Sequence, residues 1–191
     1  MINIQVVKNA IRVGEIVESS KEYGGNKHVL YSKKLQVLYD KNLPTSLKAQ
    51  QLSIVYFFVS NGIIKKIGQT SGKNGIKGCL DFYCGAGQDD PGQARFVINW
   101  LIRDELKNSN KVEVYIKHLE SVEVEIEGLT NTYKMLVPLD AKALEEASIK
   151  DYLKISNGSF PDWNFQESNK QVPAHIDAAF AAYRAERAKG K

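Results

Sequence analysis

The sequence predicts an α+β fold, in which a small antiparallel or mixed β-sheet is flanked by helices. Short runs of alternating apolar and polar residues predict the strands, and longer runs with the helical period predict the helices. The 191 residues, 43% of them apolar, suit one domain with extensions. We expect a β-rich N-terminal extension over residues 1–47, a core over 48–168 and a C-terminal helical extension over 169–191.

The elements before residue 72 are predicted as strands. Apolar runs at 4–7, 28–31 and 35–40 are separated by polar and turn residues, and they make the N-terminal part β-rich. A hairpin follows over 54–70, because two apolar runs flank Asn61-Gly62. A helix should begin shortly after the polar run that ends the hairpin.

The second half of the chain alternates helices with strands. A Gly-rich loop leads through Asp90-Pro91, a good N-cap and first helical position, into a helix over 95–107 that is too apolar for the surface. The remaining expected elements are alternating strands with one wet face at 112–117, 122–126 and 132–137, a helix over 141–155 capped by Asp140, and a final helix over 173–191 docked by Ile176, Phe180 and Tyr183.

Composition excludes several classes of function. The net charge of +4 permits nucleic-acid binding without requiring it. No window approaches the roughly 20 apolar residues of a membrane span, and the N-terminus lacks the apolar run of a signal peptide, so we expect a cytoplasmic protein with no membrane partner. Cys79 and Cys84 are the only cysteines and do not form a CxxC pair, which argues against a zinc site and a disulfide scaffold.

The hairpin register decides whether two polar side chains share a face. A two-residue Asn61-Gly62 turn would place Tyr56 opposite Ile67, and Tyr56 and Lys66 would then point apart. A three-residue loop over 60–62, with Gly62 left-handed, would place Tyr56 opposite Lys66. That second register also gathers a good apolar face, so we expect it. The apolar face would hold Val55, Phe57, Val59, Ile63 and Ile67.

Several short segments occur in an order that resembles the GIY-YIG nuclease superfamily. They are IVY at 54–56, KIG at 66–68, Thr70, GIKGCLDFY at 75–83, LEEASI at 144–149 and PDWN at 161–164. The branch that contains small type II restriction endonucleases is the most similar. The chain departs from the family pattern in three places: GIY has become Ile54-Val55-Tyr56, Lys66 stands at the first tyrosine of YIG, and Cys79 stands where the family carries an arginine.

The chemistry of phosphodiester hydrolysis matches these residues. It needs a deprotonated water, a cation beside the phosphate and stabilisation of the leaving oxygen. Tyr56 can activate the water if cations favour its phenolate, and Lys65, Lys66, Lys73 and Lys77 surround it in the sequence. A single carboxylate suits Mg²⁺, which keeps most of its waters.

The resemblance implies a metal-dependent endonuclease for double-stranded DNA, of the type II restriction kind, that acts as a homodimer. Glu145 would hold one Mg²⁺ ion, for which Mn²⁺ can substitute, and is preferred to Glu146 because its offset to Ile149 matches the family. The expected catalytic residues are Tyr56, Lys66, Tyr83, Arg95, Glu145 and Asn164, and the expected phosphate contacts are Thr70, Lys73 and Lys77.

Cys79 leaves alternatives open, because a thiol cannot give a phosphate the donors of an arginine. Lys77, Arg95 or Arg103 can supply the missing cation, and we prefer Arg95 because the loop before it can present it to the phosphate. The protein can also be an inactive relative that binds DNA or another protein, or a nuclease for RNA. Each polar residue also has a structural reading, as a solvated lysine, a strand tyrosine or a turn asparagine.

Overall fold

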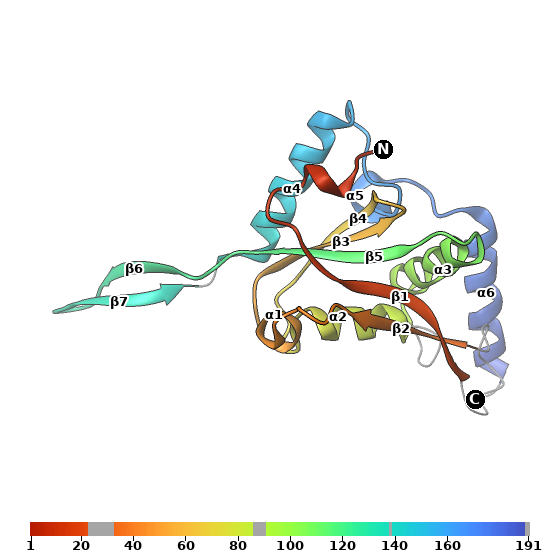
Figure 1. Cartoon of the computed structure of the whole chain (residues 1–191), viewed down its shortest axis with the longest axis horizontal. Helices are drawn as coiled ribbons and strands as arrows, with labels where there is room; N and C mark the ends of the chain where they lie inside the picture. Colours follow the sequence, from red (N-terminus) through yellow and green to blue (C-terminus); the bar gives the residue numbers. More distant parts are fainter. Residues whose placement is uncertain (23–32, 86–90, 138, 190–191) are drawn as a thin grey trace.

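The computed structural model, which describes residues 1–22, 33–85, 91–137 and 139–189, has a five-stranded antiparallel sheet at its centre (Figure 1). The strand order is β2-β1-β5-β3-β4. The strands are β1 (Ile11–Glu22), β2 (Lys33–Tyr39), β3 (Ile54–Ser60), β4 (Ile63–Thr70) and β5 (Val112–His118). With helices packed on the sheet, the predicted α+β fold class is confirmed.

Helices cover both faces of the sheet. The helices are η1 (Ile4–Val6, 3-10), α1 (Thr45–Ala49), α2 (Gly75–Cys84), α3 (Gln93–Lys107), α4 (Ala141–Ile155), α5 (Phe165–Ser168) and α6 (Ala174–Lys189). Tyr56 and Phe58 pack with α2 and α3 on one face, while Val55 and Phe57 pack with η1 and α4 on the other. All seven residues of β3 are therefore buried, and any chemistry on this strand is held in a rigid setting.

The β3-β4 hairpin corrects the predicted register. Asn61 and Gly62 form a two-residue turn with φ of 46° and 81°, so Ser60 pairs with Ile63, and the predicted three-residue loop is wrong. A β-bulge then shifts the pairing, and Phe58 lies opposite Lys66 while Tyr56 lies opposite Gly68. Because residues 56 and 58 point to the same face, Tyr56 and Lys66 still share one face.

The same bulge changes the predicted apolar face. Ile64, rather than Ile63, packs with Val55, Phe57, Val59 and Ile67. With the two-residue turn alone, Lys66 would lie on the face opposite to that of Tyr56. The extra residue in β4 brings Lys66 back to the face of Tyr56. The expected common face of Tyr56 and Lys66 is therefore confirmed, although the predicted loop is wrong.

Residues 1–47 contribute two strands to the central sheet. β1 lies between β2 and β5, so it pairs with a strand of the core on one side. The apolar run at 28–31 lies outside the described residues, as does Asp90. The helix expected over 95–107, with Asp90-Pro91 at its start, is corrected at that end. Gly92 is the N-cap of α3 and Gln93 is its first residue. The division of the chain into three parts stays a proposal.

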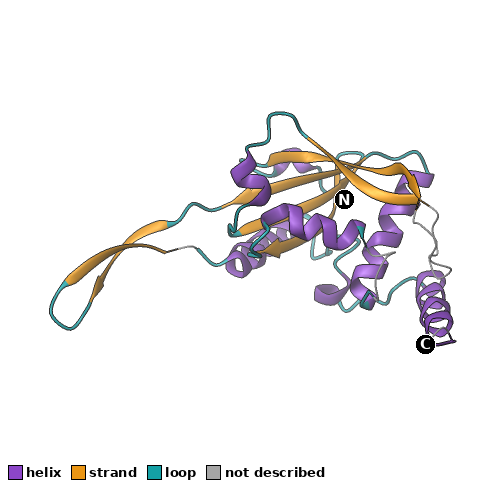
Figure 2. Cartoon of the chain, turned by 90° about the horizontal axis from the view of Figure 1, so that it is seen from below, coloured by secondary structure: helices purple, strands orange, loops and turns teal. Residues whose placement is uncertain are grey.

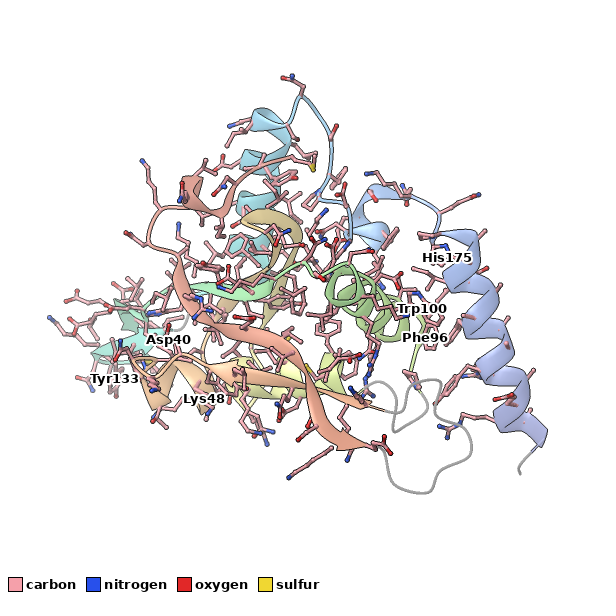
Figure 3. The ribbon with its side chains drawn as sticks, turned by 45° about the vertical axis from the view of Figure 1, so that its right-hand side comes forward. Asp40, Lys48, Phe96, Trp100, Tyr133 and His175 are labelled. Carbon is pink, nitrogen blue, oxygen red and sulfur yellow. The ribbon has the colours of Figure 1, made fainter. Side chains whose placement is uncertain are left out.

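The C-terminal helix α6 is fixed on α3 by aromatic packing. The ring of Phe96 lies 5.1 Å from that of Phe180 and 5.7 Å from that of Tyr183, measured between centroids. Ile176 is fully buried in the same cluster. Figure 3 shows Phe96 and Trp100 on the side of α3 that faces α6. The three predicted anchors of this helix are thereby confirmed.

A separate hairpin projects from the body, formed by β6 (Val122–Glu127) and β7 (Thr132–Val137) (Figures 1 and 2). Its predicted strands are confirmed, but the expectation of a single wet face is wrong, since side chains on both faces are exposed. Among the described residues, we find no helix with the length and apolar content needed to cross a membrane.

Candidate functional site

Two tyrosines meet between β3 and the last turn of α2. Tyr56 projects from β3, is only 3% exposed, and its hydroxyl oxygen lies 2.9 Å from that of Tyr83 on α2. The ring of Tyr56 lies over Gly68, the residue opposite on β4. A Cβ at Gly68 would overlap the Cζ and hydroxyl of Tyr56 and lie 2.8 Å from its Cε2. Gly68 thus provides the space in which the phenol is held.

Asn164 completes the exposed edge of β4. The strand is the last of the sheet, so its outer backbone groups need partners from elsewhere. Ile67 N–H donates to Asn164 Oδ1 at 2.8 Å, and Asn164 Nδ2 donates to the Ile67 carbonyl at 2.8 Å. Trp163 N–H also donates to the Lys65 carbonyl at 2.8 Å. These bonds fix the backbone between Lys66 and Gly68, so Asn164 acts on the site through β4.

Lys66 is a buried cation that acts on the Cys79 position. Its side chain is 8% exposed, and burial lowers its pKa, while the carboxylates of Glu167 and Glu145 oppose that change. The ammonium acts in turn on the Cys79 thiol, which lies against the Tyr56 hydroxyl. A buried ammonium in this place can meet a phosphate oxygen as a point charge.

Glu145 lies on the part of α4 that approaches β4 and is half-buried, whereas Glu146 beside it is exposed. Burial raises the pKa of Glu145, and the neighbouring carboxylate of Glu167 raises it further, while Lys66 lowers it. The structure thereby brings Glu145 to the Lys66 side of the site, as its predicted role requires. Glu146 has no such position.

Two cavities lie on either side of Tyr83. One, of about 420 Å³, is lined by Tyr56 and Tyr83, by Thr70 and Lys73, and by backbone at the start of α2. The other, of about 400 Å³, is lined by Lys66, Tyr83, Trp163 and the first residues of α3. Two of the three predicted phosphate contacts thus face the first cavity. The third, Lys77, is exposed and pairs with Asp81 one turn along α2.

The C-terminal end of α2 is held by α3. Asn99 Nδ2 donates to the Tyr83 carbonyl at 2.7 Å, and Arg95 Nε donates to the Phe82 carbonyl. The guanidinium carbon of Arg95 also lies 4.5 Å from the centre of the Phe82 ring. These contacts satisfy carbonyls that the helix leaves without internal partners. They fix the place of Tyr83.

The three cations considered for the Cys79 position are placed elsewhere. Arg95 is bound at the end of α2, and the described residues that line the two cavities do not include it. Arg103 is 1% exposed and donates to Asn99 and to the Lys33 carbonyl, so it joins α3 to β2. Lys77 points to solvent. Lys66 itself is the cation that the structure brings to Cys79.

The Tyr56 phenol does not have the lowered pKa that the surrounding lysines suggested. Burial raises its pKa well above the ordinary value, and Cys79 and Tyr83 add to the rise. Burial also raises the pKa of Tyr83 to about 12 and that of Cys79 to about 12. Lys65 does not offset the raised pKa of the Tyr56 phenol, since its ammonium pairs with Asp162 at 3.2 Å and Glu105 at 3.8 Å. Both phenols are neutral at physiological pH.

These raised pKa values make stability fall in alkaline solution. The unfolded chain loses thiol and phenol protons near pH 9 and pH 10, whereas the folded chain keeps those of Cys79 and Tyr83 up to about pH 12. Their contribution to stability is therefore complete below about pH 9 and is lost progressively as the pH rises to about 12. We expect the melting temperature to fall over this range in wild type, and to fall less in Tyr83→Phe. An equal fall in both proteins would contradict this origin.

Two residues of the site, Glu167 and Asn99, were not predicted from the sequence. Glu167 acts on Lys66, Tyr83 and Glu145, yet it follows Asn164 in a segment whose only clear motif is PDWN. Asn99 lies in an apolar helix, where a single polar residue on the buried face is itself a signal, because a buried amide needs partners. The position of Asn99 on the apolar face of the predicted helix could therefore have identified it from the sequence.

Two solved structures resemble this chain in fold. One is a mutant of EndoII from bacteriophage T4, with 17% identity and a TM-score of 0.49, covering 86% of this chain and 99% of that one. The other is the restriction endonuclease HPY188I with product DNA, with 16% identity and a TM-score of 0.40, covering 84% of each chain. No protein-family model and no curated protein sequence matches.

Proposed function

We propose that this protein is a metal-dependent endonuclease that hydrolyses double-stranded DNA, of the type II restriction kind. The observation that carries the proposal is the meeting of four groups from four elements: Tyr56, Lys66, Tyr83 and Glu145. Tyr56, Tyr83 and Lys66 supply a proton acceptor and a cation that line the two cavities, and Glu145 supplies a carboxylate near Lys66. These are the groups that phosphodiester hydrolysis needs.

The first cavity suits the phosphate of the substrate. Lys73 and the Thr70 hydroxyl line it, and the α2 N-terminus opens onto it. Gly75 N–H donates to the Gly72 carbonyl, and the N-cap residue Asn74 makes no side-chain cap hydrogen bond, so the amides of Ile76 and Lys77 are the ones in the first turn that can bind an anion. Lys66 approaches from the other side of Tyr83 and adds positive charge at the position that Cys79 leaves without it.

The tyrosine pair provides a path for the proton of the attacking water. Water gives its proton to the Tyr56 hydroxyl oxygen while Tyr56 passes its own proton across 2.9 Å to Tyr83. Tyr83 in turn releases its proton to solvent in the cavities that it lines. Neither buried phenol has to persist as a phenolate, which agrees with their raised pKa values.

The carboxylates present fit a hydrated Mg²⁺ ion. Within the described ranges, no three residues of the types His, Cys, Asp and Glu form a metal-binding group. Glu145, with Glu167 as a nearby second carboxylate, is the donor set that Mg²⁺ accepts when water and substrate oxygens complete its shell. When bound, the metal offsets negative charge on the phosphate and the leaving oxygen.

Cleavage of plasmid DNA in Mg²⁺ tests this function. We expect discrete fragments from wild type, and rates lower by about 100-fold or more in Tyr56→Phe and in Glu145→Ala, since each removes one chemical role. Glu146→Ala is the matched control, because it removes the same group from the adjacent exposed position and should retain activity. Equal activity in Glu145→Ala and wild type would exclude the assigned site.

Binding of the metal can be measured without DNA. Saturating Mg²⁺ should raise the melting temperature of wild type and of Glu146→Ala, and this shift should disappear in Glu145→Ala. An identical shift in all three proteins would place the ion elsewhere.

A second candidate function is supported by Cys79. A thiol with a pKa of about 12 gives a phosphate neither charge nor a fork of donors, as expected of a relative that binds DNA without cutting it. In that case wild type, Tyr56→Phe and Glu145→Ala would shift DNA equally in a gel and leave it intact. Cleavage by wild type alone excludes this candidate.

A further inference from the structure

The cavity at the start of α3 is lined by aromatic rings. It has a volume of about 400 Å³ and is called the α3 cavity below. The rings of Tyr83, Trp163 and Phe165 line it, together with the apolar side chains of Val97 and Ile98. A cavity of this size, with aromatic and apolar walls and few polar groups, is typical of a site for a small planar molecule.

The α3 cavity also holds a buried cation. Lys66 lines it and is only 8% exposed. No described residue forms a hydrogen bond or an ion pair with its ammonium, and the carboxylates of Glu167 and Glu145 act on it only from a distance. A buried charge without a direct partner is costly, so an anion in the cavity would stabilise the ammonium.

The N-terminus of α3 adds a second group that attracts anions. The N-cap residue Gly92 makes no side-chain hydrogen bond to the helix, and the first turn carries no acidic residue. Gly92, Gln93 and Ala94 all line the cavity, so the N-terminus of this 15-residue helix borders the same space as Lys66. The cavity therefore offers aromatic walls for a planar ring and positive charge for a phosphate. A nucleotide has both parts.

We propose that the α3 cavity receives one nucleotide of a DNA strand, with its base turned out of the helical stack. The base would lie among the aromatic rings, and a phosphate would meet Lys66 and the amides at the start of α3. A base that stays stacked in the duplex cannot enter a cavity within the protein, so the nucleotide has to leave the stack. Gln93 and Gln166 also line the cavity and offer donors and acceptors to the edge of a base. The proposal rests on the proposed function, because Lys66 and Tyr83 belong both to this cavity and to the catalytic site.

Titration of the metal-free, DNA-free protein with the four deoxynucleoside monophosphates tests the cavity without any cleavage. The chain has two tryptophans, and Trp100 lies on the side of α3 that faces α6 (Figure 3), so Trp100→Phe leaves Trp163 as the only indole. In this protein at least one nucleotide should quench the Trp163 fluorescence saturably, because its base packs against the indole. The matching nucleoside, which lacks the phosphate, should bind about tenfold more weakly or worse. No quenching by any nucleotide, or equal binding of nucleotide and nucleoside, would overturn the proposal.

A pair of variants tests whether the nucleotide occupies this cavity. Ala94 is exposed and lines the cavity, so Ala94→Phe should fill part of it and raise the dissociation constant of the nucleotide by about tenfold or more. Ala178→Phe is the matched control, because Ala178 is exposed on α6 and does not line the cavity. Circular dichroism checks that both variants are folded. Equal affinities in the two variants would contradict the assigned cavity.

DNA distinguishes a nucleotide of the substrate from a free mononucleotide. In the same metal-free protein, single-stranded oligonucleotides and duplex plasmid fragments should both quench Trp163, and Ala94→Phe should reduce the quenching in each case. Quenching by mononucleotides without quenching by duplex DNA would assign the cavity to a free nucleotide and overturn the proposal. Because these measurements need no cleavage, a protein that passes them and never cuts DNA in Mg²⁺ would refute only the proposed function.

Discussion

Gly68→Ala should reduce DNA cleavage by about 10² to 10³-fold while leaving the fold intact. The added methyl group overlaps the Cζ and hydroxyl of Tyr56, so the ring must move. A shift of about 1 Å in a reacting group can cost 10²-fold, and this shift also disrupts the 2.9 Å contact with Tyr83. Cleavage rates, together with circular dichroism of the variant, measure the effect.

The matched control is Gly92→Ala. A Cβ at Gly92 meets no atom within 4 Å, and the residue has no backbone conformation that alanine avoids. We expect cleavage close to that of wild type. Full activity in Gly68→Ala would mean that cleavage does not depend on the position of the Tyr56 ring, and the assignment of Tyr56 as proton acceptor would fail.

Asn164→Ala should lower the free energy of unfolding by about 3 to 5 kcal/mol. The side chain is fully buried, and its loss leaves the N–H and the carbonyl of Ile67 without partners. Each unsatisfied buried group costs about 1 to 3 kcal/mol. Since a domain has only about 5 to 15 kcal/mol of stability, the variant should be close to unfolding at physiological temperature. Urea denaturation gives the value.

Asp162→Ala serves as its control on the same segment. The Asp162 side chain is 53% exposed, and its ion pair with Lys65 lies at the surface. We expect a change below about 1 kcal/mol, as for other exposed ion pairs. If Asn164→Ala proved as mild as Asp162→Ala, the two bonds to Ile67 would not be the support of β4 that their geometry indicates.

The sequence predicted those parts of the fold that local patterns determine. Alternation gave the strands, and the apolar stretch containing Phe96 and Ile102 gave the buried helix α3. Tyr56, Tyr83 and Asn164 were proposed as site residues because they occur in ordered motifs, and the structure places the Tyr56 and Tyr83 hydroxyls in contact. For Asn164 the structure supplies a physical reason, since its amide presents an acceptor and a donor on separate atoms, which pair with the N–H and the carbonyl of Ile67.

Features that depend on distant contacts could not be predicted in the same way. The bulge near Lys66 depends on how β4 pairs with β3, and the turn residues Asn61-Gly62 predict only the end of the hairpin. Arg95 follows a loop whose path the sequence does not define, and its guanidinium binds the end of α2. Burial raises the pKa of Tyr56. The sequence shows the neighbouring lysines but does not show this burial, so it suggested a lowered pKa instead.

The bonds between Asn164 and Ile67 also impose an order on how the site is assembled during synthesis. The two residues are 97 positions apart, so the backbone groups of Ile67 on the outer edge of β4 lack these partners until most of the chain has been synthesised. Contacts between distant residues close late, because a long loop must be ordered first. A nascent or truncated chain would contain both tyrosines and still lack the backbone geometry that aligns them with Lys66. In the proposed nuclease, cleavage of DNA would therefore begin only after the chain has been synthesised past Asn164.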